Sequence, residues 1–248
     1  MIIFPMAGLS QRFVNAGYKV PKFQLPLWDG TVFDYAVSSF ASSFDSSPFL
    51  FIYRENGGVR NFLESRAENL GIRDVGFVPL EEPTAGQAET VELGLAEGGV
   101  ADDEALTIFN IDTFRMPWSR PEGLPSDLDG WLEVFKSTGE NWSFVRPSNE
   151  AGIAAETAEK VAISDLCCTG LYHFNNASLF RSALLTEREL PSSKELYIAP
   201  IYNHLIAAGA RVGFGLIPNN DVLFCGVPAE YEALLSTAPP YDLRDPCA

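Results

Sequence analysis

The first half of the chain alternates continuous apolar runs with amphipathic runs. Short apolar runs bounded by polar residues predict buried strands, and apolar residues spaced three and four apart predict helices. We expect strands at residues 1–7, 49–53, 75–80 and 106–111. We expect helices at residues 32–43, 59–70 and 88–96. Buried strands separated by helices predict a mostly parallel sheet with right-handed crossovers, flanked by helices.

The second half of the chain is less regular. Residues 115–129 predict a surface excursion, residues 131–135 and 142–145 a hairpin, and residues 149–157 a loop. Further strands are expected at 170–174, 212–217 and 222–225, and further helices at 177–185, 198–208 and 228–235. The sequence has no internal repeat, linker or low-complexity segment, so we expect residues 1–248 to form a single domain.

The composition of the chain is that of a globular protein without a membrane-spanning segment. The chain has 248 residues, of which 46% are hydrophobic, and a mean hydropathy of +0.03, as in a globular protein. It has no uninterrupted apolar run of about eighteen residues, so a membrane span is not expected. The apolar N-terminus lacks a preceding basic region, so a secretory signal is not expected either. We therefore expect a cytoplasmic protein.

The charge balance excludes a nucleic-acid partner and points to a different anion. A net charge of −16 is the opposite of what a nucleic-acid binder needs. In so acidic a chain, Arg12 and Lys22 beside a loop of small residues stand out as a local positive patch. With only two histidines, a metal accompanying a polyanion would have oxygen ligands, as Mg²⁺ does.

Four cysteines, Cys167, Cys168, Cys225 and Cys247, are spaced irregularly. This is not the pattern of a disulfide framework. Cys167 and Cys168 are neighbours and would point to opposite faces of a strand, so they cannot jointly bind zinc. We interpret the cysteines as packed apolar thiols.

A small-residue loop follows the first predicted strand. Its backbone N–H groups, together with the two cations that follow, suit phosphate oxygens, and open α/β sheets bind ligands at this edge. The candidate nucleotide-binding residues are Ala7, Gly8, Leu9 and Ser10, followed by the candidate catalytic residues Arg12 and Lys22. The loop matches neither a Walker loop nor the three-glycine dinucleotide motif. The alternative is an ordinary surface turn.

Two further segments carry candidate ligand-binding groups. Gly86 would let backbone approach a flat ligand, and Gln87 offers a donor and an acceptor to a base edge. The alternative is a helix start capped by Thr84. Asn110 lies near the end of the predicted strand 106–111 and Asp112 follows that strand, where a rigidly held carboxylate is a natural Mg²⁺ ligand. The alternative is a turn-forming Asp.

These segments, in this order, resemble the nucleotidyltransferases that act on sugar phosphates. The similarity covers residues 1–235 and rests on five segments: the small-residue loop with Pro21-Lys22, the Gly86-Gln87 turn, the strand-end Asp112, Glu159-Lys160 with Gly170-Leu171-Tyr172, and the Lys194–Tyr197 segment. The resemblance implies a Rossmann-like fold of the nucleotide-diphospho-sugar transferase type. It also implies Gly86 and Gln87 at the nucleobase and Mg²⁺ at Asp112.

The resemblance assigns an acceptor pocket to the second half of the chain. It implies that Lys160 contacts the acceptor phosphate, that Glu159 contacts its hydroxyls and that Gly170 leaves room for a ring. Tyr172 and Glu195 are the remaining candidate acceptor-binding residues. The alternatives are a surface Glu-Lys pair, a glycine at a strand bulge and an ordinary amphipathic helix.

The chain departs from the family pattern at two places. Ser10 stands where the family usually has Gly, so it must reach its backbone angles without the freedom of Gly. The family has a second metal-binding Asp before a Gly-Thr pair, where this chain has Cys225. Asp221 is the nearest acid, so the expected metal ligands are Asp112 and Asp221.

The sequence therefore predicts a nucleotidyltransferase that joins the NMP of an NTP to a sugar 1-phosphate and releases pyrophosphate, for nucleotide-sugar or surface polysaccharide biosynthesis. One alternative is a cytidylyltransferase acting on a phosphorylated non-sugar. Others are a metal-dependent glycosyltransferase of similar fold and an inactive sugar-nucleotide sensor. The nucleobase, the acceptor and the oligomeric state stay open, a homodimer being one possibility.

Overall fold

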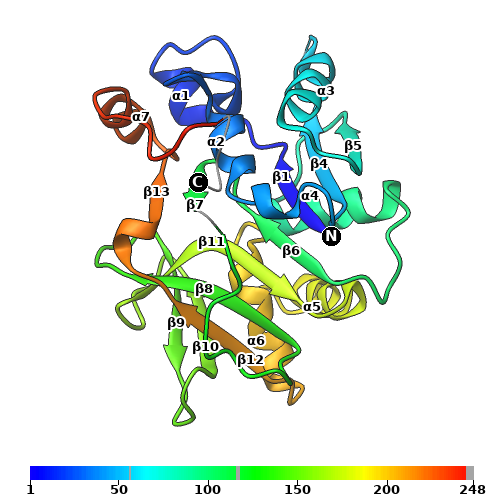
Figure 1. Cartoon of the computed structure of the whole chain (residues 1–248). Coiled ribbons are helices and arrows are strands. Elements are labelled where there is room, and N and C mark those ends of the chain that lie inside the picture. The colour runs from blue at the N-terminus through cyan, green and yellow to red at the C-terminus, as the bar shows by residue number, and fades with distance from the viewer. Residues whose placement is uncertain (56, 116–117, 244–248) are drawn as a thin grey trace. The chain divides into compact units, whose positions relative to one another are not determined.

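The structure is a computed structural model that describes residues 1–55, 57–115 and 118–243 (Figure 1). Contacts within the chain divide it into two compact units. The first unit contains Met1–Ile3, Thr84–Phe109 and Arg120–Asn219, and the second contains Phe4–Pro83, Asn110–Ser119 and residues 220–243. The single-domain organisation of residues 1–248 stays a prediction.

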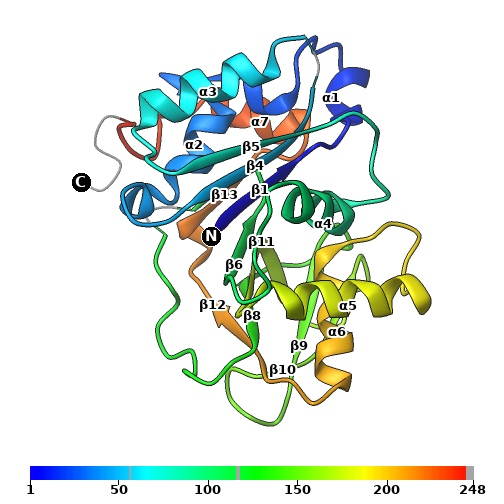
Figure 2. The same cartoon turned by 90° about the vertical axis from the view of Figure 1, so that its right-hand side faces the viewer.

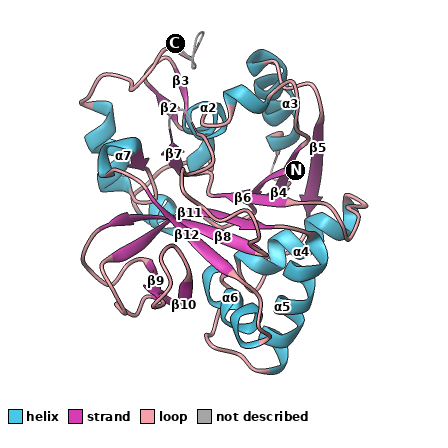
Figure 3. Ribbon diagram, turned by 60° about the horizontal axis from the view of Figure 1, so that its bottom comes forward, coloured by secondary structure: helices cyan, strands magenta, loops and turns pink. Residues whose placement is uncertain are grey.

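The first unit is a mixed sheet with three helices. Its strands are the start of β1 (Ile2–Met6), β6 (Leu106–Phe109), β8 (Gly130–Lys136), β9 (Ser143–Pro147), β10 (Ala154–Glu159), β11 (Leu166–Phe174) and β12 (Val212–Leu216). Its helices are α4 (Gln87–Glu97), α5 (Ala177–Glu189) and α6 (Ile198–Ala207), and Figure 3 shows α5 beside α6. Strand β11 pairs antiparallel with β6, β8 and β9, whereas β6 pairs in parallel with β1.

The second unit contains a parallel ladder of β4 (Phe49–Arg54) and β5 (Val75–Leu80) and two short antiparallel ladders. The short ladders are β2 (Pro26–Leu27) with β3 (Gly30–Thr31), and β7 (Thr113–Arg115) with β13 (Val222–Phe224). The helices are α1 (Gln11–Asn15), α2 (Val32–Ser38), α3 (Val59–Leu70) and α7 (Pro228–Leu235), with 3₁₀ turns at Lys22–Gln24 and Ala41–Ser43. Figure 2 shows α2 and α3 on one face of the β4–β5 ladder.

Local capping explains where several helices begin and end. Thr31 and Asp34 form a reciprocal capping box at the start of α2. Asn176 accepts a hydrogen bond from the Leu179 N–H at the start of α5. Helix α3 ends at Gly71, which adopts φ +79°, a conformation that glycine reaches at little cost. Strands with flanking helices in both units confirm the predicted α/β class.

Aromatic side chains fill the cores of both units. In the second unit, the Phe51 ring stacks on Phe4 with centroids 5.3 Å apart and packs against Phe33 at 5.0 Å. In the first unit, Phe174 stacks on Tyr202 with centroids 4.4 Å apart, and the Tyr202 hydroxyl donates to the His173 carbonyl. Burying such rings contributes the largest apolar areas available to a side chain.

Two predictions for the middle of the chain are wrong. The segments that we expected to form a hairpin are β8 and β9, and both pair with β11 instead, where Cys167 lies opposite Phe135 and Phe144. The predicted loop at 149–157 contains the start of β10, which pairs antiparallel with β9. Its composition, Ala-Ala-Glu-Thr-Ala-Glu, lacks the branched apolar residues that signal a strand, so only the partner reveals it.

The predictions about the cysteines and about membrane spans can be compared with the described residues. Cys167, Cys168 and Cys225 are buried free thiols, as predicted, and Cys247 lies outside the described residues. Burial raises the pKa of Cys167 to about 11. None of the helices in the described part of the chain is long and apolar enough to cross a membrane.

We predict that Gly130→Ala destabilises the protein by about 1–3 kcal/mol. A Cβ on Gly130 would lie 2.7 Å from the His173 carbonyl oxygen, on the neighbouring strand, so backbone must move. Urea denaturation measures the change in the free energy of unfolding. Gly8→Ala is the control, because a Cβ there meets nothing within 4 Å. Equal stabilities of the two variants would contradict this packing.

We also predict that His173 makes stability fall with acidity. Burial, with charge repulsion from Arg120 and the N-terminus, lowers the pKa of His173 to about 4. Between about pH 6.5 and pH 4 the unfolded chain binds a proton at this residue and the folded chain does not, so stability falls by about 3 kcal/mol as pH falls through this range. His173→Gln should remove that part of the pH dependence. Parallel curves of unfolding free energy against pH for variant and wild type would refute the prediction.

Candidate functional site

The loop after β1 presents small residues to solvent. Ala7 is buried, whereas Gly8 and Leu9 are exposed. Ser10 adopts φ +50° and ψ +35° just before α1, so the residue that replaces the family's glycine does take the left-handed conformation. This conformation costs a residue with a Cβ about 1–2 kcal/mol, which the loop must recover elsewhere. Arg12 is exposed on α1, and no ion pair joins it to another described residue.

Lys22 and Asp112, separated by 90 residues in sequence, meet in the second unit. Lys22 begins a 3₁₀ turn and Asp112 precedes β7, and the ammonium of Lys22 donates to Asp112 Oδ2. Their side chains are 22% and 17% exposed, so both are largely withdrawn from water. A half-buried carboxylate needs a partner of opposite charge. Two of the three predicted catalytic side chains are therefore in direct contact.

The backbone around Asp112 is held by the segment that follows β13. The Cys225 N–H donates to the Asp112 carbonyl at 2.8 Å. A Cβ on Gly226 would lie 3.1 Å from Asp112 Oδ2, so glycine lets this segment pack closely against the carboxylate. Glu230, in the first turn of α7, accepts hydrogen bonds from the Gly226 and Val227 N–H groups at 2.8 and 3.2 Å.

The predicted pairing of Asp112 with Asp221 as metal ligands needs correction. In the β7–β13 ladder, Thr113 lies opposite Phe224 and Arg115 lies opposite Val222. Asp221 therefore stands at the far end of the ladder from Asp112, roughly 13 Å along it, too far for one metal ion to bind both. Sequence proximity to Cys225 suggested Asp221, but an antiparallel ladder carries it away from the site.

Cys225 lies beside Asp112. Burial of the Cys225 thiol, with the charge of Asp112 as a second cause, raises the pKa of this thiol to about 12.

The donor set at Asp112 fits a simple magnesium site. Mg²⁺ is commonly bound by one or two protein carboxylates, with water and substrate phosphates in the other positions. Asp112 supplies one carboxylate on a rigid part of the chain. Among the described residues, no group of three or more His, Cys, Asp or Glu side chains is arranged to hold a metal ion. An ion at Asp112 would leave positions open for substrate phosphates and water.

In the first unit, the turn at the start of α4 packs against a second loop. Helix α4 begins after Gly86, so the alternative of a cap at Thr84 is wrong. A Cβ on Gly86 would lie 2.5 Å from the Leu196 carbonyl oxygen. Ala88 N–H donates to that oxygen at 2.8 Å, and Leu196 N–H donates to the Ala85 carbonyl at 3.0 Å. The absent side chain of Gly86 thus serves a close approach of two backbone segments.

The predicted acceptor residues gather around Tyr197. The Lys160 ammonium donates to the Tyr197 hydroxyl at 2.6 Å, and this bond raises the pKa of Lys160. Glu159 Oε1 lies 3.5 Å from the same ammonium, and its other oxygen accepts from Ser143. Burial raises the pKa of Tyr197 against the lowering effect of the Lys160 bond, and the nearby Glu195 adds to the rise. Two predicted residues, Lys160 and Glu159, therefore form one polar cluster with Tyr197.

The other predicted residues of the acceptor site lie in the sheet. Gly170 adopts φ +97° where the register between β11 and β8 shifts, so it occupies a strand bulge. Tyr172 is 5% exposed, and burial raises its pKa well above the usual value. Gln87 and Asn110, which are predicted to bind the nucleotide, lie outside these strands and are half-buried at the start of α4 and after β6. The binding roles of these four residues stay predictions.

Sequence reasoning missed Tyr197 as a site residue. Its hydroxyl accepts a hydrogen bond from Lys160, 37 positions away in the sequence. The Lys194–Tyr197 segment was singled out, but a tyrosine before an apolar helix also predicts ordinary core packing. The left-handed Lys160, at φ +56°, gives no sequence signal either.

One of three comparisons with known proteins found similar chains. A scan against protein-family models and a search of curated proteins found no match. Among solved structures, the chain is similar to the nucleoside-diphosphate-sugar pyrophosphorylase from Vibrio cholerae, with 44% identity over 96% of this chain and 100% of that one and a TM-score of 0.90.

More distant structures share the fold. The inositol-1-phosphate CTP transferase from T. maritima is 16% identical over 94% of this chain and 93% of that one, with a TM-score of 0.71. A UDP-glucose pyrophosphorylase is 18% identical over 94% and 96%, also with a TM-score of 0.71. The 44% identity to the Vibrio cholerae protein over nearly the whole chain establishes family membership in addition to the shared fold. The chain belongs to the nucleoside-diphosphate-sugar pyrophosphorylase family of sugar-phosphate nucleotidyltransferases.

Proposed function

We propose that the protein transfers the NMP group of an NTP to a sugar 1-phosphate and releases pyrophosphate. An oxygen of the acceptor phosphate attacks the α-phosphorus, and the bond from that phosphorus to the β-phosphate bridging oxygen breaks. The acceptor phosphate is already ionised near pH 7, so no strong base is needed. Catalysis then consists of alignment and charge neutralisation.

The observation that carries the proposal is the contact between Lys22 and Asp112 in the second unit, which also holds the Gly8–Ser10 loop and Arg12. It supports a site where a cation for phosphate and a carboxylate for a metal ion are both held by the fold. Lys22 stabilises the charge that develops on the α-phosphate, and exposed Arg12 stabilises the leaving pyrophosphate. Mg²⁺ at Asp112 neutralises phosphate charge when bound.

The cluster in the first unit supports recognition of the acceptor. Lys160 presents a flexible ammonium, suited to a phosphate, next to the Glu159 carboxylate, suited to sugar hydroxyls. Tyr197 limits the conformations open to Lys160 by accepting one of its hydrogen bonds. We place Gln87, at the start of α4, at the edge of the nucleobase. A product nucleotide sugar would serve polysaccharide synthesis in the cytoplasm, where NTPs are made.

The alternatives differ in specific features. A structural neighbour is named as an inositol-1-phosphate CTP transferase, so a cytidylyltransferase acting on a non-sugar phosphate has a precedent on this fold. A metal-dependent glycosyltransferase would need a second acid within two residues of Asp112, where the chain has Thr113 and Phe114. A sugar-nucleotide sensor would bind without turnover.

The test is pyrophosphate release with Mg²⁺, each NTP in turn, and a panel of acceptors made of several sugar 1-phosphates and one non-sugar, inositol 1-phosphate. Release that requires one NTP and one sugar 1-phosphate supports the proposal. Release only with CTP and a non-sugar phosphate favours the cytidylyltransferase. Binding of an NTP with no release across the panel supports the sensor and contradicts the proposal.

We predict that Lys22→Ala lowers kcat about 100- to 1000-fold, because it removes a charge that acts on the transferred phosphate. Lys19→Ala is the matched control, since Lys19 is a nearby exposed lysine that is not placed in the site. A thermal melt of each variant checks that the fold persists. A folded Lys22→Ala variant with the turnover of Lys19→Ala would remove Lys22 from the mechanism.

A further inference from the structure

The last turn of α5 contacts one predicted substrate loop of the first unit directly and is linked to the other through Glu89 of α4. One loop, residues 84–88, carries Gly86 and Gln87 and is called the nucleotide turn. The other, residues 190–197, carries Glu195 and ends at Tyr197, and is called the acceptor loop. Neighbouring residues Glu187 and Arg188 of α5 hold one loop each.

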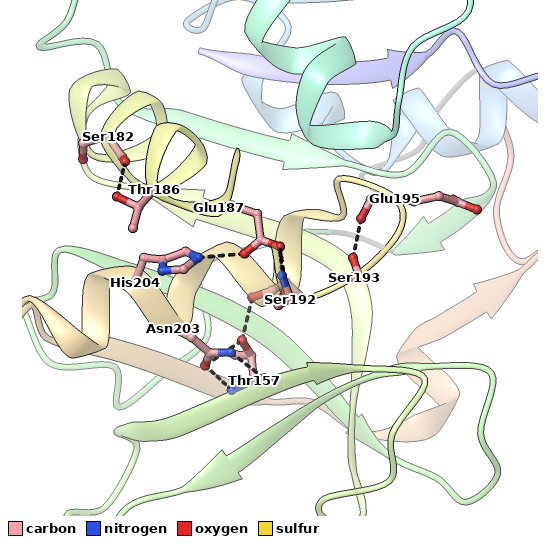
Figure 4. A network of polar contacts seen from close by, with 10 residues as sticks. Thr157, Ser182, Thr186, Glu187, Ser192, Ser193, Glu195, Asn203 and His204 are labelled. Carbon is pink, nitrogen blue, oxygen red and sulfur yellow. Dashed lines mark hydrogen bonds and ion pairs between the residues drawn. The ribbon is translucent and has the colours of Figure 1, made fainter. Parts of the chain in front are cut away.

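Glu187 holds the start of the acceptor loop. Its Oε1 accepts hydrogen bonds from the Ser192 N–H and hydroxyl, each at 2.7 Å, and its Oε2 lies 2.7 Å from His204 Nε2 on α6 (Figure 4). The Glu187 side chain is 1% exposed, and a carboxylate this buried is stable only when such partners satisfy it. These hydrogen bonds lower its pKa against the opposing effect of burial.

Arg188 holds the nucleotide turn through Glu89. Its guanidinium donates to Glu89 Oε1 at 2.9 Å and to Glu92 Oε2 at 2.5 Å, both on α4. The other oxygen of Glu89 accepts from the Ala85 N–H, the bond that contributes most to the lowered pKa of Glu89. Arg188 thereby acts on the turn without touching the acceptor loop.

The nucleotide turn and the acceptor loop are also hydrogen-bonded directly to each other. The backbone of Leu196 exchanges one hydrogen bond with Ala85 and one with Ala88, across the position where Gly86 has no side chain. The acceptor loop continues to Tyr197, which contacts Lys160. A displacement of either loop therefore strains its hydrogen bonds to the other loop. Both loops are also linked to the last turn of α5, the acceptor loop directly and the nucleotide turn through α4.

We infer that Glu187 and Arg188 are positioning residues that couple the nucleotide turn to the acceptor loop, so that ordering one substrate loop orders the other. The inference rests on the proposed function in assigning a substrate to each loop. It extends that function by predicting that the two binding steps are cooperative: a first substrate that orders its loop lowers the entropy cost of binding the second.

Hydrogen exchange of the backbone amides tests the coupling without any substrate. Arg188→Ala removes contacts to Glu89 and Glu92 of α4 and none to the acceptor loop. It should nevertheless accelerate exchange of the peptide 192–197 about five- to tenfold, because the bond of the Leu196 N–H to Ala85 loosens. Ser192→Ala removes one contact to the acceptor loop only, and should accelerate exchange at Ala88 about fivefold. Both substituted side chains are accessible to solvent, so the fold tolerates the changes.

Arg181→Ala is the matched control. Arg181 is an arginine on the same helix, 30% exposed, and it donates to Asp102 and to the Val100 carbonyl, away from both loops. Exchange of peptides 84–88 and 192–197 in this variant should equal that of the wild type. If Arg188→Ala or Ser192→Ala affects only the nearer loop, or neither loop, the coupling is overturned.

Steady-state kinetics provide the second measurement. In Arg188→Ala, coupling predicts that KM rises for both NTP and acceptor, whereas a role confined to the nucleotide turn would raise the KM for NTP alone. The kinetics and the hydrogen exchange test different claims. No turnover with any substrate pair refutes the proposed function, while the exchange rates still decide whether the loops are coupled.

Discussion

The pairing of Lys22 with Asp112 is the constraint on which the second unit's chemistry depends. About four-fifths of each side chain is hidden from water, so the charge of each group is stable only beside the opposite charge of the other. Asp112 is also fixed through its backbone by Cys225, and Gly226 lets that segment approach. In the proposed mechanism, a substrate phosphate or a metal ion would meet charges that are already positioned here. Preorganised charge of this kind stabilises a transition state without reorganisation during the reaction.

In the first unit, backbone and side-chain hydrogen bonds hold two loops against each other. Its predicted substrate groups lie on a turn and a loop that are joined by backbone hydrogen bonds and anchored by two adjacent residues of α5. Backbone bonds impose this geometry irrespective of side-chain identity, and they require a residue without a Cβ at Gly86. The glycine that sequence reasoning assigned to a ligand is thus equally a requirement of loop packing.

The sequence predicted what depends on local pattern and failed where a distant partner decides. Apolar runs located β4, β5 and β6, and the order of weak motifs indicated the family. The strand β10 was missed because its apolar content is low and β9 supplies its register. Asp221 was chosen for its place in the sequence, and the β7–β13 ladder carries it to the wrong end. Tyr197 was overlooked because Lys160, which donates to its hydroxyl, becomes its neighbour only in the fold.

The central claim is that Asp112 binds the metal ion that accompanies the nucleotide. Calorimetric titration of the nucleotide identified by the substrate panel, with and without Mg²⁺, tests it in wild type and in Asp112→Asn, a variant of nearly equal size. The account predicts that Mg²⁺ tightens nucleotide binding to the wild type about tenfold or more and that the variant loses this difference. An Asp112→Asn variant that is folded and keeps the full Mg²⁺ dependence would contradict the account.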